Sequence, residues 1–423
     1  MRHVILGNGP AGVIAAEVLR KHAPSDDIVV VGDEPGPPYS RMAIPYLLVG
    51  KIDEQGTHLR KDPGHFDRLD IRLRTARATA VDTSARTVAL DDGTVLPFDR
   101  LLVATGSTPV RPPIPGVDLP GVHTCWTLED ARRIMERARP GARVLQMGAG
   151  FIGCIIMEAL AGRGVELSVV EMGDRMVPRM MGQGAGGMIK RWVERKGVSV
   201  YTSTRVEAIT RGDNGSPLVV QLAGGRRLGV DLVISATGVQ PNIGFLRDAG
   251  VHCRRGVVTD ARCSSHVRGI YAAGDCAEAY DPITDTWLVS AIQPNAADEA
   301  TIAALNMVGK DAQLKAVTYI NVLDTMGLVS CSFGQWQGVP GGDYAELSDD
   351  DAFKYLRLEF DGDLIVGANA IGLTEHVGVL RGFVEGGVRL GDWKDRLLRD
   401  PTLLAEAYLA CAQAQDAWLR HVA

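Results

Sequence analysis

The chain has 423 residues, of which 46% are hydrophobic and 23% are charged, and its formal net charge is −6. This length predicts two or three globular domains, each with its own core. The slight acidic excess argues against a nucleic acid or an anionic membrane as a partner. No stretch approaches the ~18 uncharged apolar residues of a membrane-spanning helix. The first expected strand begins at once and leaves no room for a signal peptide, so we expect a cytoplasmic protein.

The sulfur-containing side chains predict structural roles. The seven cysteines form no Cys-x-x-Cys pair and are interpreted as buried reduced thiols. The nine histidines are scattered, so no metal site is expected. Four methionines in one segment are interpreted as gap-filling core side chains: Met172, Met176, Met180 and Met181.

A glycine fingerprint follows the first expected strand, the apolar run at 3–6. It consists of Gly7, Asn8, Gly9, Pro10, Ala11 and Gly12, and an apolar helix pattern follows it. Its first glycine permits a tight turn, the second lets a diphosphate reach the backbone, and the third lets the helix pack against the strand. A strand at 28–31 leads to Asp33 and Glu34, either of which can accept hydrogen bonds from a ribose. This arrangement predicts a dinucleotide site.

The segment after this site contains turn signals. A proline-rich loop at 35–38 precedes Arg41, and the turn at 91–93 predicts a hairpin. A further strand ends in a short turn made of Ala104, Thr105 and Gly106. A proline-rich link at 109–115 closes this part of the chain.

A second fingerprint repeats the first one in the same order. It follows a strand at 143–147 and consists of Gly148, Ala149, Gly150, Phe151, Ile152 and Gly153. The next strand ends in Glu171, which can accept hydrogen bonds from an unmodified ribose and repels a 2′-phosphate. We therefore expect NAD(H) rather than NADP(H) here. Arg175 and Arg179 either soften that preference or are solvated charges.

Two later strands end in similar turns. The strand at 232–235 leads to Ala236, Thr237 and Gly238. The strand at 269–273 leads to Gly274 and Asp275, which places a carboxylate at the strand end where ligands bind in open α/β sheets. This aspartate can also be a helix N-cap, and both roles can hold at once.

The order of these motifs resembles the flavoproteins of the glutathione reductase fold from residue 2 to about residue 300. The segment 37–52, with Tyr39 and Arg41, is similar to the rubredoxin reductase, ferredoxin reductase and nitrite reductase flavoprotein group, and the tail is similar to their C-terminal domain. The resemblance implies an α/β fold with two Rossmann-like domains and a C-terminal α+β domain. It implies an FAD domain at 1–112 and 245–315, an inserted NAD domain at 113–244, and the third domain at 316–423.

The resemblance also implies the cofactor contacts. FAD would lie on the first fingerprint, with Arg41 near its pyrophosphate, the Ala78 backbone at its adenine and Asp275 at its ribitol. The helix opening at Pro294 would aim its positive end at the flavin pyrimidine. The residues expected around FAD are Gly7, Gly9, Pro10, Ala11, Gly12, Asp33, Glu34, Arg41, Ala78, Ala104, Thr105, Gly106, Gly274, Asp275, Asn295 and Ala296. Those expected at NAD(H) are Gly148, Gly150, Phe151, Ile152, Gly153 and Glu171, and Gly238 is also expected at a cofactor.

The function implied is an NADH-dependent reductase, in which hydride passes from nicotinamide to flavin and electrons then pass to rubredoxin, ferredoxin or another acceptor. It needs no catalytic side chain. Thiol or CoA-disulfide reduction would need a cysteine near Met42, where none occurs, and Cys154 and Cys276 are expected to be structural. An NADH oxidase and a flavin-bearing relay subunit of a larger complex remain alternatives, and a homodimer is also open.

The sequence departs from many relatives at two positions. These relatives carry a lysine five residues after the Arg41 position and a glutamate two residues after the last glycine of the second fingerprint, and the two form an ion pair beside flavin N5. Here the positions hold Tyr46 and Ile155. Both are expected near flavin N5, where the missing positive charge predicts slower reduction by NADH. The stretch 393–419 is expected to be one amphipathic helix that packs on the domain.

Overall fold

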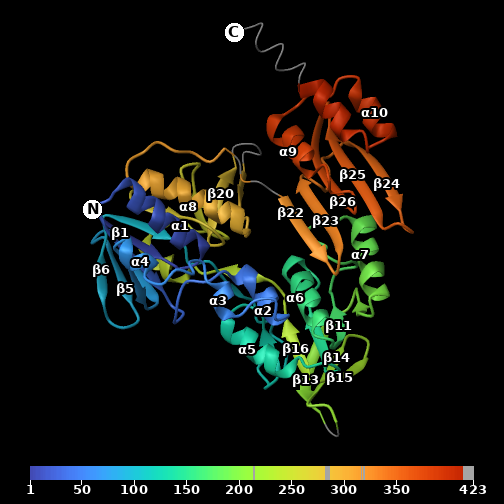
Figure 1. Ribbon diagram of the computed structural model, residues 1–423, viewed down its shortest axis with the longest axis horizontal. Helices are drawn as coiled ribbons and strands as arrows, with labels where there is room; N and C mark the ends of the chain where they lie inside the picture. Colours follow the sequence, from blue (N-terminus) through green and yellow to red (C-terminus); the bar gives the residue numbers. More distant parts are fainter. Residues whose placement is uncertain (213–214, 282–285, 316, 318–319, 413–423) are drawn as a thin grey trace. The chain divides into compact units, whose positions relative to one another are not determined.

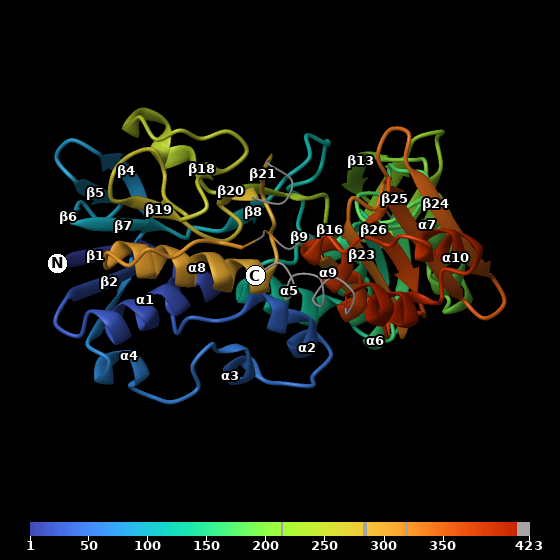
Figure 2. The same ribbon diagram turned by 90° about the horizontal axis from the view of Figure 1, so that it is seen from above.

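The computed structural model describes residues 1–212, 215–281, 286–315, 317 and 320–412. The chain divides into two compact units, which are drawn in Figures 1 and 2. The first unit consists of Met1–Val110 and Val239–Thr318, and the second consists of Arg111–Gly238 and Tyr319–Ala423. Each unit is thus built from two separate stretches of the sequence.

A five-stranded parallel sheet forms the centre of the first unit. Its strands, in spatial order, are β19 (Ile270–Ala272), β7 (Arg100–Val103), β1 (Arg2–Leu6), β2 (Asp27–Gly32) and β3 (Ile71–Thr75). Alternate residues of the central strands belong to two different core clusters, with Ile5 in one and Val4 and Leu6 in the other. Both faces of the sheet are therefore covered, which explains why these strands are continuous apolar runs in the sequence.

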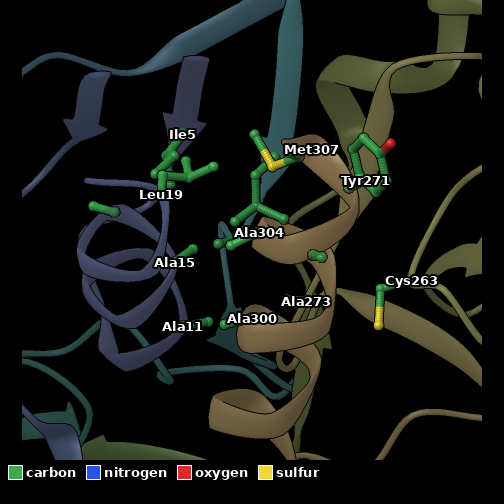
Figure 3. Close-up of a cluster of buried hydrophobic side chains, with 14 of the residues drawn as sticks. Ile5, Ala11, Ala15, Leu19, Cys263, Tyr271, Ala273, Ala300, Ala304 and Met307 are labelled. Atoms are coloured by element: carbon green, nitrogen blue, oxygen red, sulfur yellow. The ribbon is translucent and has the colours of Figure 1, made fainter. Parts of the chain in front are cut away.

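Two helices, α1 (Pro10–His22) and α8 (Gln293–Met307), lie side by side on one face of this sheet (Figures 1 and 2). Figure 3 shows that Ala11 and Ala15 of α1 face Ala300 and Ala304 of α8. These small side chains let the two helices approach closely. Both helices start at the same end of the sheet, and the predicted proline, Pro294, lies in the first turn of α8.

Smaller elements complete the first unit. Two small sheets are antiparallel: β4 (Ala78–Asp82), β5 (Thr87–Leu90) and β6 (Val95–Pro97) form one, and β8 (Ser107–Pro109) and β17 (Val239–Pro241) form the other. A third sheet is mixed: β20 (Ala277–Asp281) pairs in parallel with β18 (Val257–Thr259) and antiparallel with β21 (Thr286–Leu288). The short helices are α2 (Ile44–Leu48), α3 (Glu54–Thr57) and α4 (His65–Arg68), with 3-10 turns at Arg41–Ala43 and Gly244–Ala249. The hairpin predicted at 91–93 is confirmed, because β5 and β6 pair across it and the Gly93 N–H donates to the Leu90 carbonyl at 3.1 Å.

The second unit contains a five-stranded parallel sheet. Its strands, in spatial order, are β12 (Ser199–Tyr201), β11 (Glu166–Val170), β10 (Arg143–Met147), β16 (Leu232–Ser235) and β9 (Val122–Thr124). Four of these strands repeat the order of the first sheet, while the edge strand β9 comes before the fingerprint strand in the chain rather than after it. The other elements of this part are α5 (Leu128–Arg137), α6 (Phe151–Gly162), α7 (Gln183–Arg195) and the antiparallel strands β13 (Val206–Arg211), β14 (Leu218–Leu222) and β15 (Arg227–Val230). In both sheets the strand before the fingerprint is central, so the sequence repeat is a structural repeat.

The C-terminal part is an antiparallel sheet with helices. Its strands, in spatial order, are β22 (Ile320–Thr325), β23 (Leu328–Gly334), β26 (Leu364–Ile371), β25 (Lys354–Asp361) and β24 (Asp343–Asp349), and its helices include α9 (Val377–Gly386) and α10 (Trp393–Arg399). The predicted fold class is therefore confirmed: two Rossmann-like parts and a C-terminal α+β domain.

Two local expectations are wrong. The single helix over 393–419 is interrupted, because α10 ends at Arg399 and helical residues resume only at 404–412; Pro401 lacks the N–H that a continuous helix needs. Residues 413–419 lie outside the described part. Of the four methionines, Met176, Met180 and Met181 are buried, but Met172 is 74% exposed. No helix in the described ranges has the length and apolarity to cross a membrane.

Candidate functional site

The first fingerprint is a tight turn between β1 and α1. Gly7 has a φ of +112°, which side-chain-bearing residues rarely adopt, and a Cβ there would overlap the Ala104 carbonyl. A Cβ on Gly12 would overlap the Gly7 carbonyl, so α1 packs directly on the turn. The Gly7 N–H donates to Val31 at 2.6 Å, which ties the turn to β2. Ala104 thereby joins the predicted glycines at one end of the sheet.

The middle glycine of this turn fits a diphosphate. Gly9 has an ordinary φ of −73°, and no atom lies within 4 Å of where its Cβ would stand. It precedes Pro10 at the start of α1, and no side chain caps this helix. The open backbone and the positive helix end provide the two features that bind a diphosphate at a helix N-terminus.

The second fingerprint has the same geometry between β10 and α6. Gly148 has a φ of +96°, and a Cβ there would overlap the Ala236 carbonyl, just as Gly7 meets Ala104. A Cβ on Gly153 would stand 2.5 Å from the Gly148 carbonyl oxygen, whereas Gly150 is open and starts an uncapped helix. The second turn therefore fits a diphosphate for the same reasons.

The predicted ribose acids already have protein partners. Asp33 pairs with Arg77 at 2.9 Å. Glu34 accepts hydrogen bonds from the Tyr39 hydroxyl at 2.5 Å and from the Arg41 guanidinium at 2.7 Å. Arg41 is thus brought to one of the two acids, at the end of β2.

In the second unit, Glu171 is fixed against its fingerprint. Its two oxygens accept from the Ala149 N–H at 2.7 Å and the Gly173 N–H at 2.8 Å. Arg175 pairs with Asp174 at 2.7 Å and donates to the Met181 carbonyl at 2.9 Å. The carboxylate therefore sits at the turn, as its predicted role requires, while this arginine has partners of its own.

The second Ala-Thr-Gly turn is in place as well. Its Gly238 has a φ of +114°. Of the residues expected at NAD(H), Phe151 and Ile152 form the first turn of α6 and are half-buried. Tyr46 lies on α2 in the first unit and is 54% exposed, and Ile155 lies on α6 in the second.

A further group of predicted residues meets at Gly274. A Cβ on Gly274 would stand 3.4 Å from that of Ala296 and 3.5 Å from that of Ala11, so the starts of α8 and α1 both lie beside it. Asp275 follows and accepts a hydrogen bond from the buried Ser107 hydroxyl at 2.7 Å. The structure thus joins the ends of β1, β7 and β19 and the starts of α1 and α8.

The other expected residues of the first unit lie on several of its elements. Thr105 and Asn242 exchange two hydrogen bonds, of 2.7 and 2.9 Å, and Gly106 follows with a φ of +65°. Asn295 is buried at the start of α8 and donates to the Ser290 hydroxyl at 2.5 Å. Ala78 begins β4.

Sequence reasoning missed two buried polar side chains at these turns. The Gln146 amide nitrogen donates to the carbonyl oxygens of Gly148 and Gly153 at 2.8 and 2.9 Å. Glu299, on α8, accepts from the Gly274 N–H at 2.7 Å and is 3% exposed. A glutamine inside an apolar strand and a glutamate among the alanines of α8 were the available signals.

The thiols are not arranged for redox chemistry. All seven cysteines are unpaired. Burial raises the pKa of Cys154 to about 12 and that of Cys276 to about 11, which opposes thiolate formation. In the described ranges no three histidine, cysteine or acidic side chains gather as a metal site would require.

Comparisons with known proteins agree with the two sites. The family described as pyridine nucleotide-disulphide oxidoreductase matches residues 1–300. The NADH-dependent phenylglyoxylate dehydrogenase subunit epsilon of Aromatoleum evansii is 29% identical over 366 residues, 86% of this chain and 86% of that protein. The NADH oxidase of Methanocaldococcus jannaschii is 32% identical over 331 residues, 75% of this chain and 72% of the oxidase. Among solved structures, this protein is similar to a chain of the covalent putidaredoxin reductase–putidaredoxin complex. The two superpose with a TM-score of 0.89 at 23% identity, and the match covers 97% of this protein and 99% of the chain in the complex.

The resemblance drawn from the motifs is therefore confirmed. The turns that carry it have the geometry of dinucleotide sites, and the family match spans both of them. The cofactors are FAD and NAD(H). The chain belongs to the pyridine nucleotide-disulphide oxidoreductase family and is a flavin-dependent enzyme that oxidises NAD(P)H.

Proposed function

We propose that the enzyme binds FAD at the first fingerprint, binds NADH at the second, and passes the electrons to a small redox protein such as ferredoxin or rubredoxin. The observation that supports this assignment is the repeated geometry: Gly9 and Gly150 are open, while the glycines around them are closed by backbone. Bound FAD supplies a centre that accepts a hydride and releases electrons singly. The protein supplies binding, orientation and charge.

The residues that would hold FAD come from several elements of the first unit. The α1 N-terminus would face the diphosphate, Asp275 would hold the ribitol, and Asp33 or Glu34 would hold the adenosine ribose. The uncapped start of α8 would stabilise negative charge on the flavin ring. These residues belong to the domain proposed at 1–112 and 245–315, and the NADH site belongs to the domain proposed at 113–244.

Relatives supply the alternatives to a ferredoxin-type acceptor. The Aromatoleum evansii protein is a dehydrogenase subunit, the Methanocaldococcus jannaschii protein is an NADH oxidase, and the solved complex pairs a reductase with putidaredoxin. We favour the last arrangement, because the segment with Tyr39 and Arg41 is similar to the ferredoxin and rubredoxin reductase group. As part of this proposal the enzyme is cytoplasmic, since its unpaired cysteines suit a reducing compartment.

Matched alanine variants test the assignment of the two cofactors. Gly9 and Gly150 have φ values of −73° and −75°, so alanine fits both turns but places a methyl group where a diphosphate would lie. Gly9→Ala should fold and lose FAD, and Gly150→Ala should keep FAD and bind NADH at least about tenfold more weakly, a loss of about 1.4 kcal/mol. Each variant is the control for the other. Loss of FAD from Gly150→Ala but not from Gly9→Ala would reverse the assignment.

The acceptor is tested separately. NADH-dependent reduction is measured anaerobically with ferredoxin and rubredoxin, and in air with oxygen alone. Faster turnover with one of the iron proteins than with oxygen is expected. Rapid turnover with oxygen and none with either protein would favour the NADH oxidase. If the protein reduces neither iron protein nor oxygen, and copurifies in a stoichiometric assembly, it is a relay subunit.

A further inference from the structure

Glu299 is a buried carboxyl at the turn where FAD is expected. It lies one helical turn after Asn295 on α8 and is 3% exposed. Its Oε2 accepts the Gly274 N–H at 2.7 Å, across 25 residues of sequence. Gly274 has a φ of +78° and precedes Asp275, so the glutamate holds the backbone of the turn that carries the expected ribitol ligand.

Two acidic side chains act electrostatically on Glu299. Asp275 follows Gly274 on the turn that Glu299 holds, and the exposed Asp298 precedes Glu299 on α8. Burial raises the pKa of Glu299 to about 8; the hydrogen bond from Gly274 opposes this shift, and the charges of Asp275 and Asp298 add to it. Burial also keeps the pKa of the nearby Cys263 thiol well above its usual range, so this thiol is neutral.

The helix that packs against α8 has its basic residues, Arg20, Lys21 and His22, in its last turn, whereas its start lies beside Gly274. Its residues in the shared core are Ala11, Ala15, Ala16 and Leu19, and Figure 3 shows Ala11, Ala15 and Leu19 in this contact. An ionised Glu299 therefore has no positive partner there, and it stands beside a second carboxylate.

We propose that Glu299 is a positioning residue for FAD that acts in its protonated form, so that its ionisation weakens cofactor binding. The inference rests on the proposed FAD site. Protonated Glu299 still accepts the Gly274 N–H and adds no charge beside Asp275 and the anionic diphosphate. Ionised Glu299 adds a buried negative charge, which Asp275 and the diphosphate both repel. By linkage, FAD binding then favours the proton and proton loss favours FAD release.

The test measures the Kd of FAD for the full chain from pH 6 to pH 9.5. In the wild type the Kd should be constant at low pH and then rise by up to about tenfold per pH unit once Glu299 ionises. Glu299→Gln keeps an acceptor for the Gly274 N–H but cannot ionise, so its Kd should stay at the low-pH value of the wild type. Asp298→Asn is the matched control on the same helix; it should retain the rise, which begins at a slightly lower pH because the charge of Asp298 is removed.

The outcomes separate this inference from the proposed function. If Glu299→Gln shows the same rise as the wild type, or if the wild-type Kd does not change with pH, Glu299 has no such role. If the wild type binds no FAD at any pH, the assignment of the site itself fails. Glu299→Ala leaves the Gly274 N–H without its acceptor and should bind FAD more weakly than Glu299→Gln at pH 6; equal affinity would contradict the positioning role.

Discussion

The side-chain amide of Gln146 braces the turn that ends at Gly153. Its nitrogen donates to the Gly153 carbonyl at 2.9 Å and to the Gly148 carbonyl at 2.8 Å, and the side chain is fully buried. In the first fingerprint the corresponding strand position holds Ile5, which has no polar atom to offer. The second turn is therefore held by a side chain as well as by backbone.

Gln146→Leu should weaken NADH binding and leave FAD content unchanged. It removes two hydrogen bonds, each worth about 1 kcal/mol, and leaves the carbonyls of Gly148 and Gly153 without this donor. We expect NADH affinity to fall several-fold and the melting temperature to decrease, as measured by titration and by thermal unfolding. Ile5→Leu is the control at the matching position of the first unit. Unchanged NADH affinity in folded Gln146→Leu would mean that the brace has no effect on the site.

Glu171 should make the enzyme prefer NADH to NADPH by at least about tenfold in kcat/KM, or roughly 1.4 kcal/mol. Its carboxylate is held at the turn by Ala149 and Gly173, where it would meet a 2′-phosphate. Glu171→Gln should narrow the gap mainly by improving NADPH, since it removes the charge and keeps a hydrogen-bond acceptor. Steady-state kinetics with both cofactors measure this, and equal kinetics in the wild type would contradict it.

Neither Cys154 nor Cys276 should be needed for turnover. Both thiols are fully buried, and each donates to a backbone carbonyl, Cys154 to Ala149 at 3.7 Å and Cys276 to Val103 at 3.3 Å. Alanine variants should reduce an artificial one-electron acceptor within a few-fold of the wild-type rate, provided that they fold and bind FAD. Loss of activity in an FAD-loaded Cys154→Ala protein would reopen thiol chemistry, and Cys331→Ala is a buried control elsewhere.

Reduction of the flavin by NADH should be slower than in relatives that carry the lysine–glutamate pair. The resemblance implies that Tyr46 and Ile155 stand where those relatives carry the pair, so no positive charge would orient the nicotinamide there. If the positions meet at the flavin, as the resemblance implies, Tyr46→Lys with Ile155→Glu should accelerate bleaching of the flavin absorbance. Ile155→Glu alone should not, because a lone buried charge is costly. Rapid mixing measures these rates, and wild-type reduction as fast as in the relatives would refute the prediction.

Predictions from local sequence worked where the cause is local. The Asp91–Gly93 turn and the proline at the start of α8 depend on φ and ψ over a few residues, and both were predicted correctly. Apolar spacing predicts a helix across Pro401, but it takes no account of the N–H that this proline lacks, and α10 ends at Arg399. Met172 was assigned to the core by its neighbours in sequence, but burial depends on which elements pack over it.

The sequence by itself determined the two glycine turns, because Gly7 and Gly148 have a positive φ and a Cβ on Gly12 or Gly153 would meet the backbone, and these needs appear as fixed spacing. Only the tertiary structure decided which side chains support those turns. Glu299 reaches Gly274 because α8 packs through alanines beside α1, and Gln146 reaches Gly153 because the start of α6 lies against β10. Such contacts depend on the packing of elements that are separate in the chain, and burial then sets whether a carboxyl such as Glu299 keeps its proton.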